Sequence, residues 1–152
     1  EKLFRNVVRE KLKMLLSAMG PIASDASIPI EEKIRKISEN YTQLLLENEE
    51  LPLFILNEWS VNKRLFADLI RETRQHAEPV IEKQLRESGM QITLEDLIVN
   101  TLGMILFPFI AKPLILSSGL VQEDQFTAFV AGRKEKIPAW IISLTKQTVA
   151  SV

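Results

Sequence analysis

Apolar positions recur every three to four residues over most of the chain, which is the spacing of one buried face of an α-helix. No stretch alternates with the two-residue period of a half-buried strand. The pattern therefore predicts an all-α protein, a bundle of about six helices that forms one domain over residues 1–152. The expected helices span about 1–19, 29–47, 52–59, 61–88, 94–111 and 122–148.

Residues that break or cap helices set the expected boundaries. Gly20 and Pro21 are expected to end the first helix, because glycine has low helix propensity and proline lacks a backbone donor. Gly89 is expected to cap the end of the 61–88 helix. Thr93 and Asp96 have the spacing of a capping box, which predicts that the next helix starts there.

The stretch 97–120 is apolar on every side and carries one charge, Lys112. A helix that is apolar all round needs cover on all sides. It is either the core helix of a monomeric bundle or, as we favour, a helix shared with a partner subunit. A membrane span is rejected, because the uncharged run contains Asn100 and Pro108 and is too short. Pro108 is also expected to free the carbonyl of Met104.

The two most apolar segments are the expected contact surfaces of a homodimer. We expect a second copy of the chain to be joined through residues 94–111 and 122–148. The expected interface residues are Ile98, Ile105, Phe109, Phe129, Ile137, Trp140, Ile141 and Leu144.

Composition narrows the possible functions. The formal net charge of −1 argues against a free-standing nucleic-acid-binding domain, which would carry a basic patch. The absence of cysteine excludes disulfides and thiolate chemistry and fits a reducing cytosol. The first 19 residues alternate charged and apolar positions, so they are not a signal peptide. Because the chain starts at Glu1 without a methionine, we expect it to be a fragment or a processed product.

Candidate chemistry is sparse. His76 is the single histidine, and Glu72 is four residues before it, but a metal site needs three or four ligands. No metal or other cofactor is therefore expected. The sequence also lacks a phosphate-binding glycine loop, a nucleophile elbow and a paired-carboxylate motif. We assign no catalytic residue and do not expect an enzyme.

The middle of the chain combines large apolar side chains with a few amides. This combination fits either an ordinary core or an apolar pocket with orienting polar groups, which is typical of small-molecule sites. In the second interpretation a small apolar or amphipathic ligand lies near Trp59 and is oriented by Asn57 or Asn100. The expected ligand-binding residues are Tyr41, Phe54, Asn57, Trp59, Phe66, Ile70, Asn100, Met104 and Phe107.

Three segments resemble the tetracycline-repressor (TetR) family of bacterial transcriptional regulators. Residues 1–10 resemble the start of that family's fourth helix, which leads out of the DNA-binding head. Residues 37–56 resemble its fifth and sixth helices, and residues 126–144 resemble its final dimerisation helix. The resemblance covers nearly the whole chain and rests on the order and spacing of these segments.

The resemblance implies a ligand pocket among the middle helices and a two-fold dimer whose last two helices form a four-helix bundle. The DNA-reading head would precede Glu1, so DNA would be bound only through that head. The implied function is that of a cytoplasmic transcriptional repressor, in which a ligand moves residues 1–19 and so the two heads. The alternative is a helical interaction or scaffold domain without a ligand, and an enzyme ranks third. Neither the ligand nor the operator can be inferred.

Overall fold

The computed structural model describes residues 2–146, apart from the side chains of residues 2, 4 and 5. Within this range all regular elements are helices, which confirms the predicted all-α class. The elements are α1 (Lys2–Ser24), α2 (Ile30–Glu47), α3 (Leu51–Val61), α4 (Lys63–Ser88), α5 (Leu94–Ile110), α6 (Lys112–Ser117), the 3-10 helix η1 (Glu123–Gln125) and α7 (Phe126–Thr145). Residues 147 and 148, expected at the end of the last helix, lie outside the described residues.

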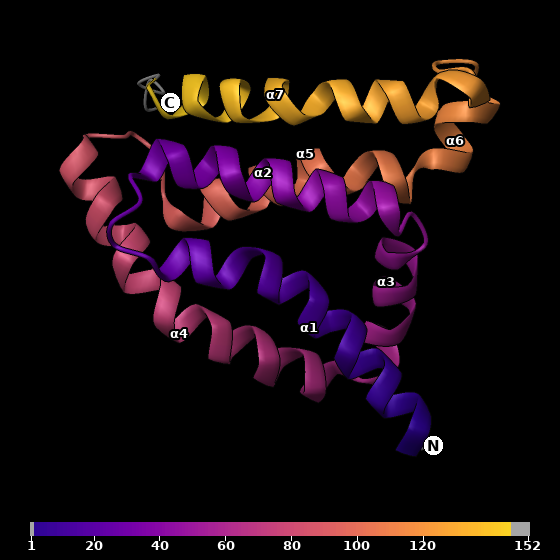
Figure 1. Ribbon diagram of the computed structural model, residues 1–152, viewed down its shortest axis with the longest axis horizontal. Coiled ribbons are helices and arrows are strands. Elements are labelled where there is room, and N and C mark those ends of the chain that lie inside the picture. Colours follow the sequence, from indigo (N-terminus) through magenta and orange to yellow (C-terminus); the bar gives the residue numbers. More distant parts are fainter. Residues whose placement is uncertain (1, 147–152) are drawn as a thin grey trace, which may run out of the picture.

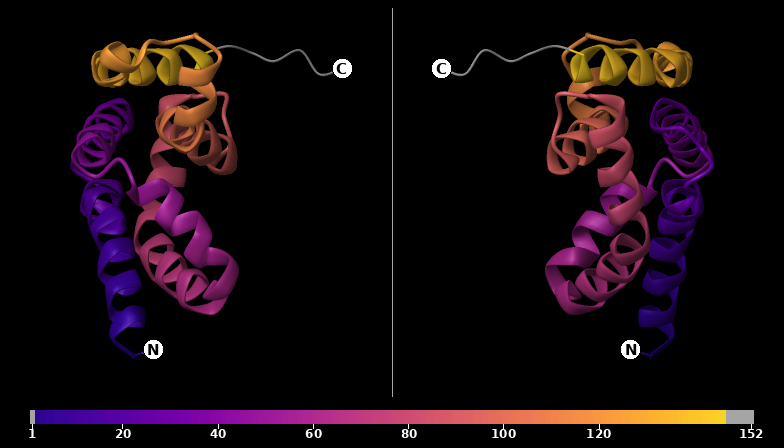
Figure 2. Two further views of the ribbon diagram at one scale, coloured as in Figure 1. Left: turned by 90° about the vertical axis from the view of Figure 1, so that its right-hand side faces the viewer. Right: turned by 90° about the vertical axis from the view of Figure 1, so that its left-hand side faces the viewer.

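The helices are stacked in levels, with α7 on one side of α2 and α5, and with α1 and α4 on the other (Figure 1). α7 lies across one end of the molecule, over α2 and α5, and the side views in Figure 2 show the same arrangement. α1 and α4 pack together below them, and α3 runs down one side from the end of α2 to the start of α4. The start of α1 therefore lies far from α7. Among the described helices, none is both long and apolar enough to cross a membrane.

α1 is longer than its sequence predicts, because it passes through Pro21. The expected end at Gly20 and Pro21 is therefore wrong. Proline has a φ compatible with a helix and removes one backbone donor, so a well-packed last turn can offset its cost. Here Ala23 is buried, and its carbonyl accepts a hydrogen bond of 2.8 Å from the Nζ of Lys33. Tertiary contacts thus outweigh the local stop signal.

α2 is the central helix and packs against both α1 and α7. Its apolar stripe is buried as the three-to-four-residue spacing predicts, and comprises Ile30, Ile34, Ile37, Tyr41 and Leu45. Glu31 and Glu32 lie in its first turn, where negative charge complements the helix dipole. Glu31 also pairs with Lys146 just beyond the end of α7, at 3.5 Å.

The predicted caps around the loop between α4 and α5 are confirmed. Gly89 follows α4 with a φ of 70°, a left-handed conformation that glycine adopts without a Cβ penalty. The Oγ1 of Thr93 accepts a hydrogen bond of 3.1 Å from the backbone N–H of Asp96, which caps the start of α5.

Two hydrophobic clusters of unequal size hold the helices together. The larger one joins α2, α5 and α7 with the second half of α1 and the end of α4. The smaller one joins the first half of α1 to α3 and the start of α4, and its fully buried members are Val8, Leu12 and Phe66. The part of the molecule around the start of α1 therefore has much less buried apolar surface than the part beneath α7.

Polar contacts reinforce the end of the molecule where α1 turns into α2. The Nε2 of Gln84 in α4 donates to the carbonyl of Ile28 in the α1–α2 loop at 2.8 Å. The backbone N–H of Gln91, just before α5, donates to the carbonyl of Thr145 in α7, also at 2.8 Å. Loops that lie far apart in the sequence are thus fixed to neighbouring helices at this end.

Candidate functional site

α5 and α7 form an antiparallel pair that Arg133 joins near its middle. Pro108 has no backbone N–H, so the carbonyl of Met104 lacks its helical donor, as the sequence predicts. The Nη2 of Arg133 donates to this carbonyl at 3.2 Å. Farther along, Phe109 near the end of α5 meets Phe126 at the start of α7 edge to face, with ring centroids 6.3 Å apart. An arginine of one helix therefore replaces the bond that a proline removes from the other.

The guanidinium of Arg133 also lies over two aromatic rings of α7. Its central carbon is 5.6 Å from the ring centroid of Phe129 and 5.3 Å from that of Trp140. Such cation–π contacts contribute about 0.5–1 kcal/mol at exposed sites. Burial lowers the pKa of Arg133, and its Nε has no hydrogen-bond partner among the described residues. A positive charge is thus held in largely apolar surroundings at the surface.

An exposed, mainly apolar surface surrounds Arg133, and we name it the α5–α7 face. It consists of Val99, Asn100, Gly103 and Phe107 of α5, and of Phe129, Gly132, Arg133, Lys136, Trp140 and Leu144 of α7. Val99 is 69% exposed, Phe107 60% and Trp140 43%. The bond from Arg133 to Met104 places the two rows of side chains next to each other. Large exposed apolar side chains on two neighbouring helices are typical of interaction sites.

The residues predicted for the dimer interface divide between this face and the protein's own core. Phe129, Trp140 and Leu144 belong to the α5–α7 face. Four others are buried inside the single chain, namely Ile105, Phe109, Ile137 and Ile141, and Ile98 packs partly against the same cluster. The periodicity of α5 and α7 is clear in the sequence, but it does not say which side faces α2.

The residues predicted to bind a ligand occupy three different environments. Tyr41 is buried in the larger cluster, and Met104 packs against it. Phe66 is buried in the smaller cluster, with Phe54 packed against it. The remaining five side chains are exposed, namely Asn57, Trp59, Ile70, Asn100 and Phe107. Their joint lining of one ligand pocket stays a prediction.

Five residues of the α5–α7 face are not among the site residues predicted from the sequence, namely Val99, Gly103, Gly132, Arg133 and Lys136. Val99, Gly103 and Phe107 are spaced by four residues and so lie on one side of α5. That spacing was visible in the sequence, but the apolar residues on the other sides of the helix concealed it. A glycine inside each of two long helices was the remaining signal.

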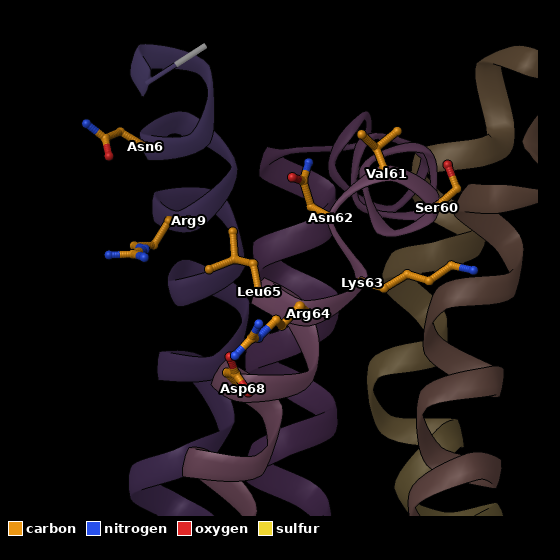
Figure 3. A pocket seen from close by; sticks show the side chains of 9 residues that line it. All are labelled: Asn6, Arg9, Ser60, Val61, Asn62, Lys63, Arg64, Leu65 and Asp68. Atoms are coloured by element: carbon orange, nitrogen blue, oxygen red, sulfur yellow. The ribbon is translucent and has the colours of Figure 1, made fainter.

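An open hollow of about 700 Å³ lies where the start of α1 meets the junction of α3 and α4 (Figure 3). Its lining residues are Asn6, Arg9, Ser60, Val61, Asn62, Lys63, Arg64, Leu65 and Asp68. Figure 3 shows Asn6 and Arg9 pointing to one side of this region and Lys63 pointing to the opposite side. Asp68 pairs with Arg71 at 3.2 Å. The polar groups do not converge on one point, so the hollow has no clear binding chemistry.

A second hollow of about 430 Å³ lies between α1 and α4 and includes His76. The Nδ1–H of His76 donates to the carbonyl of Glu72 at 3.1 Å, so the pair is joined through the backbone. Within residues 2–146, no three or more His, Asp or Glu side chains lie close enough together to hold a metal ion.

Several buried polar groups lie among the central helices. The hydroxyls of Ser38, Thr42 and Thr101 have no hydrogen-bond partner among the described residues. Burial also raises the pKa of the Tyr41 hydroxyl, which therefore stays protonated at physiological pH. An unpaired buried hydroxyl typically costs about 1–3 kcal/mol, so these positions are weak points in the packing around α2.

Comparison with known proteins yields no relative. No family model matches the chain, and neither a curated protein nor a solved structure matches it.

Proposed function

We propose that this chain is the ligand-sensing and dimerisation domain of a cytoplasmic, TetR-like transcriptional repressor, with its DNA-binding head upstream of residue 1. The observation that carries the proposal is the α5–α7 face, since an antiparallel helix pair with exposed aromatic side chains suits assembly into a four-helix bundle. The resemblance of residues 1–10, 37–56 and 126–144 to that family supports the same assignment.

In this proposal α1 transmits the signal to the head. Its second half is fixed in the larger cluster and by the bond from Lys33, whereas its first half has only the smaller cluster beneath it. A dimer would hold two heads about 34–36 Å apart, the length of one DNA turn. A ligand that binds more tightly to the conformation with α1 in another position would favour a different spacing of the heads. Its difference in affinity for the two conformations limits how far it can shift the equilibrium between them.

The ligand is proposed to be a small apolar or amphipathic molecule near α3. Trp59 is 54% exposed, and Leu53 and Leu56 of the same helix are also exposed, so α3 offers apolar surface that its own chain does not cover. The smaller cluster beside α3 has few fully buried residues and could rearrange around a ligand at low cost.

The two tryptophans allow a test of this location. A panel of small amphipathic aromatic compounds is titrated against Trp140→Phe and Trp59→Phe variants while the tryptophan emission is recorded. We expect compounds that bind to change the emission of Trp140→Phe, which retains Trp59, and to leave that of Trp59→Phe nearly unchanged. A response confined to Trp59→Phe would place the ligand at the α5–α7 face and contradict the proposed location.

Dimerisation is tested by light scattering at micromolar concentration. We expect a dimer for the wild type and a monomer for Trp140→Glu, which puts a charge on the exposed face. Ile141→Glu would be unsuitable, because Ile141 is fully buried and the variant would lose its fold. A monomeric wild type would contradict the proposal and favour a helical scaffold domain for a different partner.

A further inference from the structure

Two glycines lie inside the helices of the α5–α7 face, although neither the backbone conformation nor the packing of the described chain requires glycine there. Gly103 is near the middle of α5 and Gly132 is in the first half of α7, both exposed and both without a positive φ. A Cβ added at either position would meet no heavy atom within 4 Å. Glycine destabilises the interior of a helix relative to alanine. Neither backbone conformation nor packing within the described chain requires glycine at these positions.

Both glycines lie at the same level of the antiparallel pair. Gly103 directly precedes Met104, Gly132 directly precedes Arg133, and these two neighbours are hydrogen-bonded at 3.2 Å. One turn further along α5 stands the exposed Phe107, and one turn before stands the exposed Val99. The helix backbones are therefore uncovered at the middle of the face and flanked by large apolar side chains on α5.

We propose that a second copy of this chain docks on the α5–α7 face about a two-fold axis at the level of Gly103 and Gly132, where the helix backbones of the two copies approach most closely. The inference rests on the proposed function, because it specifies the contact of the proposed dimer. Glycine at a crossing point lets two helices approach closely, since no side chain separates their backbones.

The shape, size and charge of the face suit a second copy. About such an axis, the uncovered backbone at the glycines of one copy faces the uncovered backbone of the other. The large apolar side chains of the two copies then lie beside one another. α5 has 17 residues, so the face is about 25 Å long and about 20 Å wide across two helices. Because protruding side chains increase the accessible area of this face, that area is on the order of the ~800 Å² per partner that stable interfaces bury. The net charge of −1 adds little long-range repulsion between copies.

Gly103→Ala and Gly132→Ala give a test in which the fold and the dimer respond in opposite directions. In samples dilute enough to be monomeric, we expect each variant to melt at a higher temperature than the wild type, because alanine favours the helix. Analytical ultracentrifugation should show a dimer dissociation constant raised several-fold in each variant. For Gly103→Leu we expect an increase of more than tenfold.

A matched control separates this contact from a general effect of added bulk. Ala67 is an exposed helical residue of α4, away from the face, and Ala67→Leu should leave the dissociation constant unchanged. A wild type that stays monomeric would overturn the proposed function itself. A dimeric wild type whose glycine variants associate as tightly or more tightly would overturn only the inference that the glycines mark the crossing point.

Discussion

Lys33 of α2 joins its helix to α1, and this contact requires the burial of a charged group. Its side chain is 1% exposed, and its ammonium donates to the carbonyl of Ala23 near the end of α1, where helix carbonyls carry partial negative charge. Burial lowers the pKa of Lys33. The folded state thus binds this proton less tightly than the unfolded state, so this residue favours folding more as the pH rises toward 10.5.

Replacing Lys33 tests the value of this contact. Lys33→Ala should lower the free energy of unfolding by about 2–4 kcal/mol in urea, because it leaves a cavity and an unpaired carbonyl. Lys33→Met keeps most of the stem and removes the charge, so a smaller loss is expected. From pH 8 to 10.5 the wild type should gain stability relative to Lys33→Met. An Ala variant as stable as the wild type would show that the bond contributes nothing.

Arg133 and Pro108 form a pair whose energetics can be separated by a double-mutant cycle. Arg133→Met removes the donor to the Met104 carbonyl and should cost about 1–2 kcal/mol in urea unfolding. In the Pro108→Ala background the restored backbone N–H can bond to that carbonyl, so the same substitution should cost less. We expect a coupling of about 0.5–1 kcal/mol. Strict additivity would mean that Arg133 does not compensate for the proline.

At the scale of the element, α1 contains a proline, Pro21, which is unfavourable inside a helix. Proline inside a helix removes one hydrogen bond and costs about 3 kcal/mol relative to alanine, yet α1 continues through Pro21. The burial of its last turn and the contact with Lys33 offset this cost.

Pro21→Ala should therefore stabilise the protein. We expect the free energy of unfolding to rise by about 1–3 kcal/mol, measured in urea, because the carbonyl of Ser17 regains its helical donor. Pro29→Ala is the matched control, since Pro29 lies at the N-cap of α2, where no helical bond is lost, and it should give no gain. If both variants gained the same free energy of unfolding, the gain would not come from removing a proline from the interior of α1.

At the scale of the whole molecule, stability is distributed unevenly. The larger cluster runs along α2, α5 and α7 and is reinforced by the loop contacts of Gln84 and Gln91, whereas the smaller cluster lies around the first half of α1 and α3. Regions with few buried apolar contacts open locally at lower free energy than the rest of a fold. We therefore expect the first half of α1 and α3 to unfold locally at the lowest free energy.

Hydrogen exchange followed by mass spectrometry should reveal this gradient. Amides around Val8 in α1 and throughout α3 should exchange at least tenfold faster than those around Leu45 in α2 and Ile141 in α7. Leu12→Ala, which weakens the smaller cluster, should accelerate exchange in the first two regions and leave α2 and α7 almost unchanged. Uniform protection along the chain would contradict two clusters of unequal strength.

The sequence predicted the helices better than their mutual arrangement. Periodicity and capping signals placed α2, the cap at Thr93 and the free carbonyl of Met104 correctly, because these features depend on local geometry. The end of α1 was misplaced, since burial of Ala23 and the bond from Lys33 come from residues that only the fold brings close.

The candidate site was less predictable for the same reason. An apolar residue such as Ile141 or Trp140 gives the same sequence signal whether it faces the core or the surface, and the structure buries the first and exposes the second. The periodic pattern identifies a helix face, but the neighbours that cover it are set by packing. Glycines within α5 and α7 were detectable, although their meaning depends on what lies next to them.

If the proposed dimer forms through the α5–α7 face, the stability of the folded chain depends on protein concentration. If two copies cover this face, mass action stabilises the folded chain, by about 2.7 kcal/mol when the available partner is at 100 times its dissociation constant. The melting temperature of the wild type should then rise with concentration, whereas that of Trp140→Glu should stay constant. A concentration-independent wild type would exclude such linkage. Under this linkage a cell with few copies would lose them faster to proteolysis, so the rate of synthesis would set lifetime as well as amount.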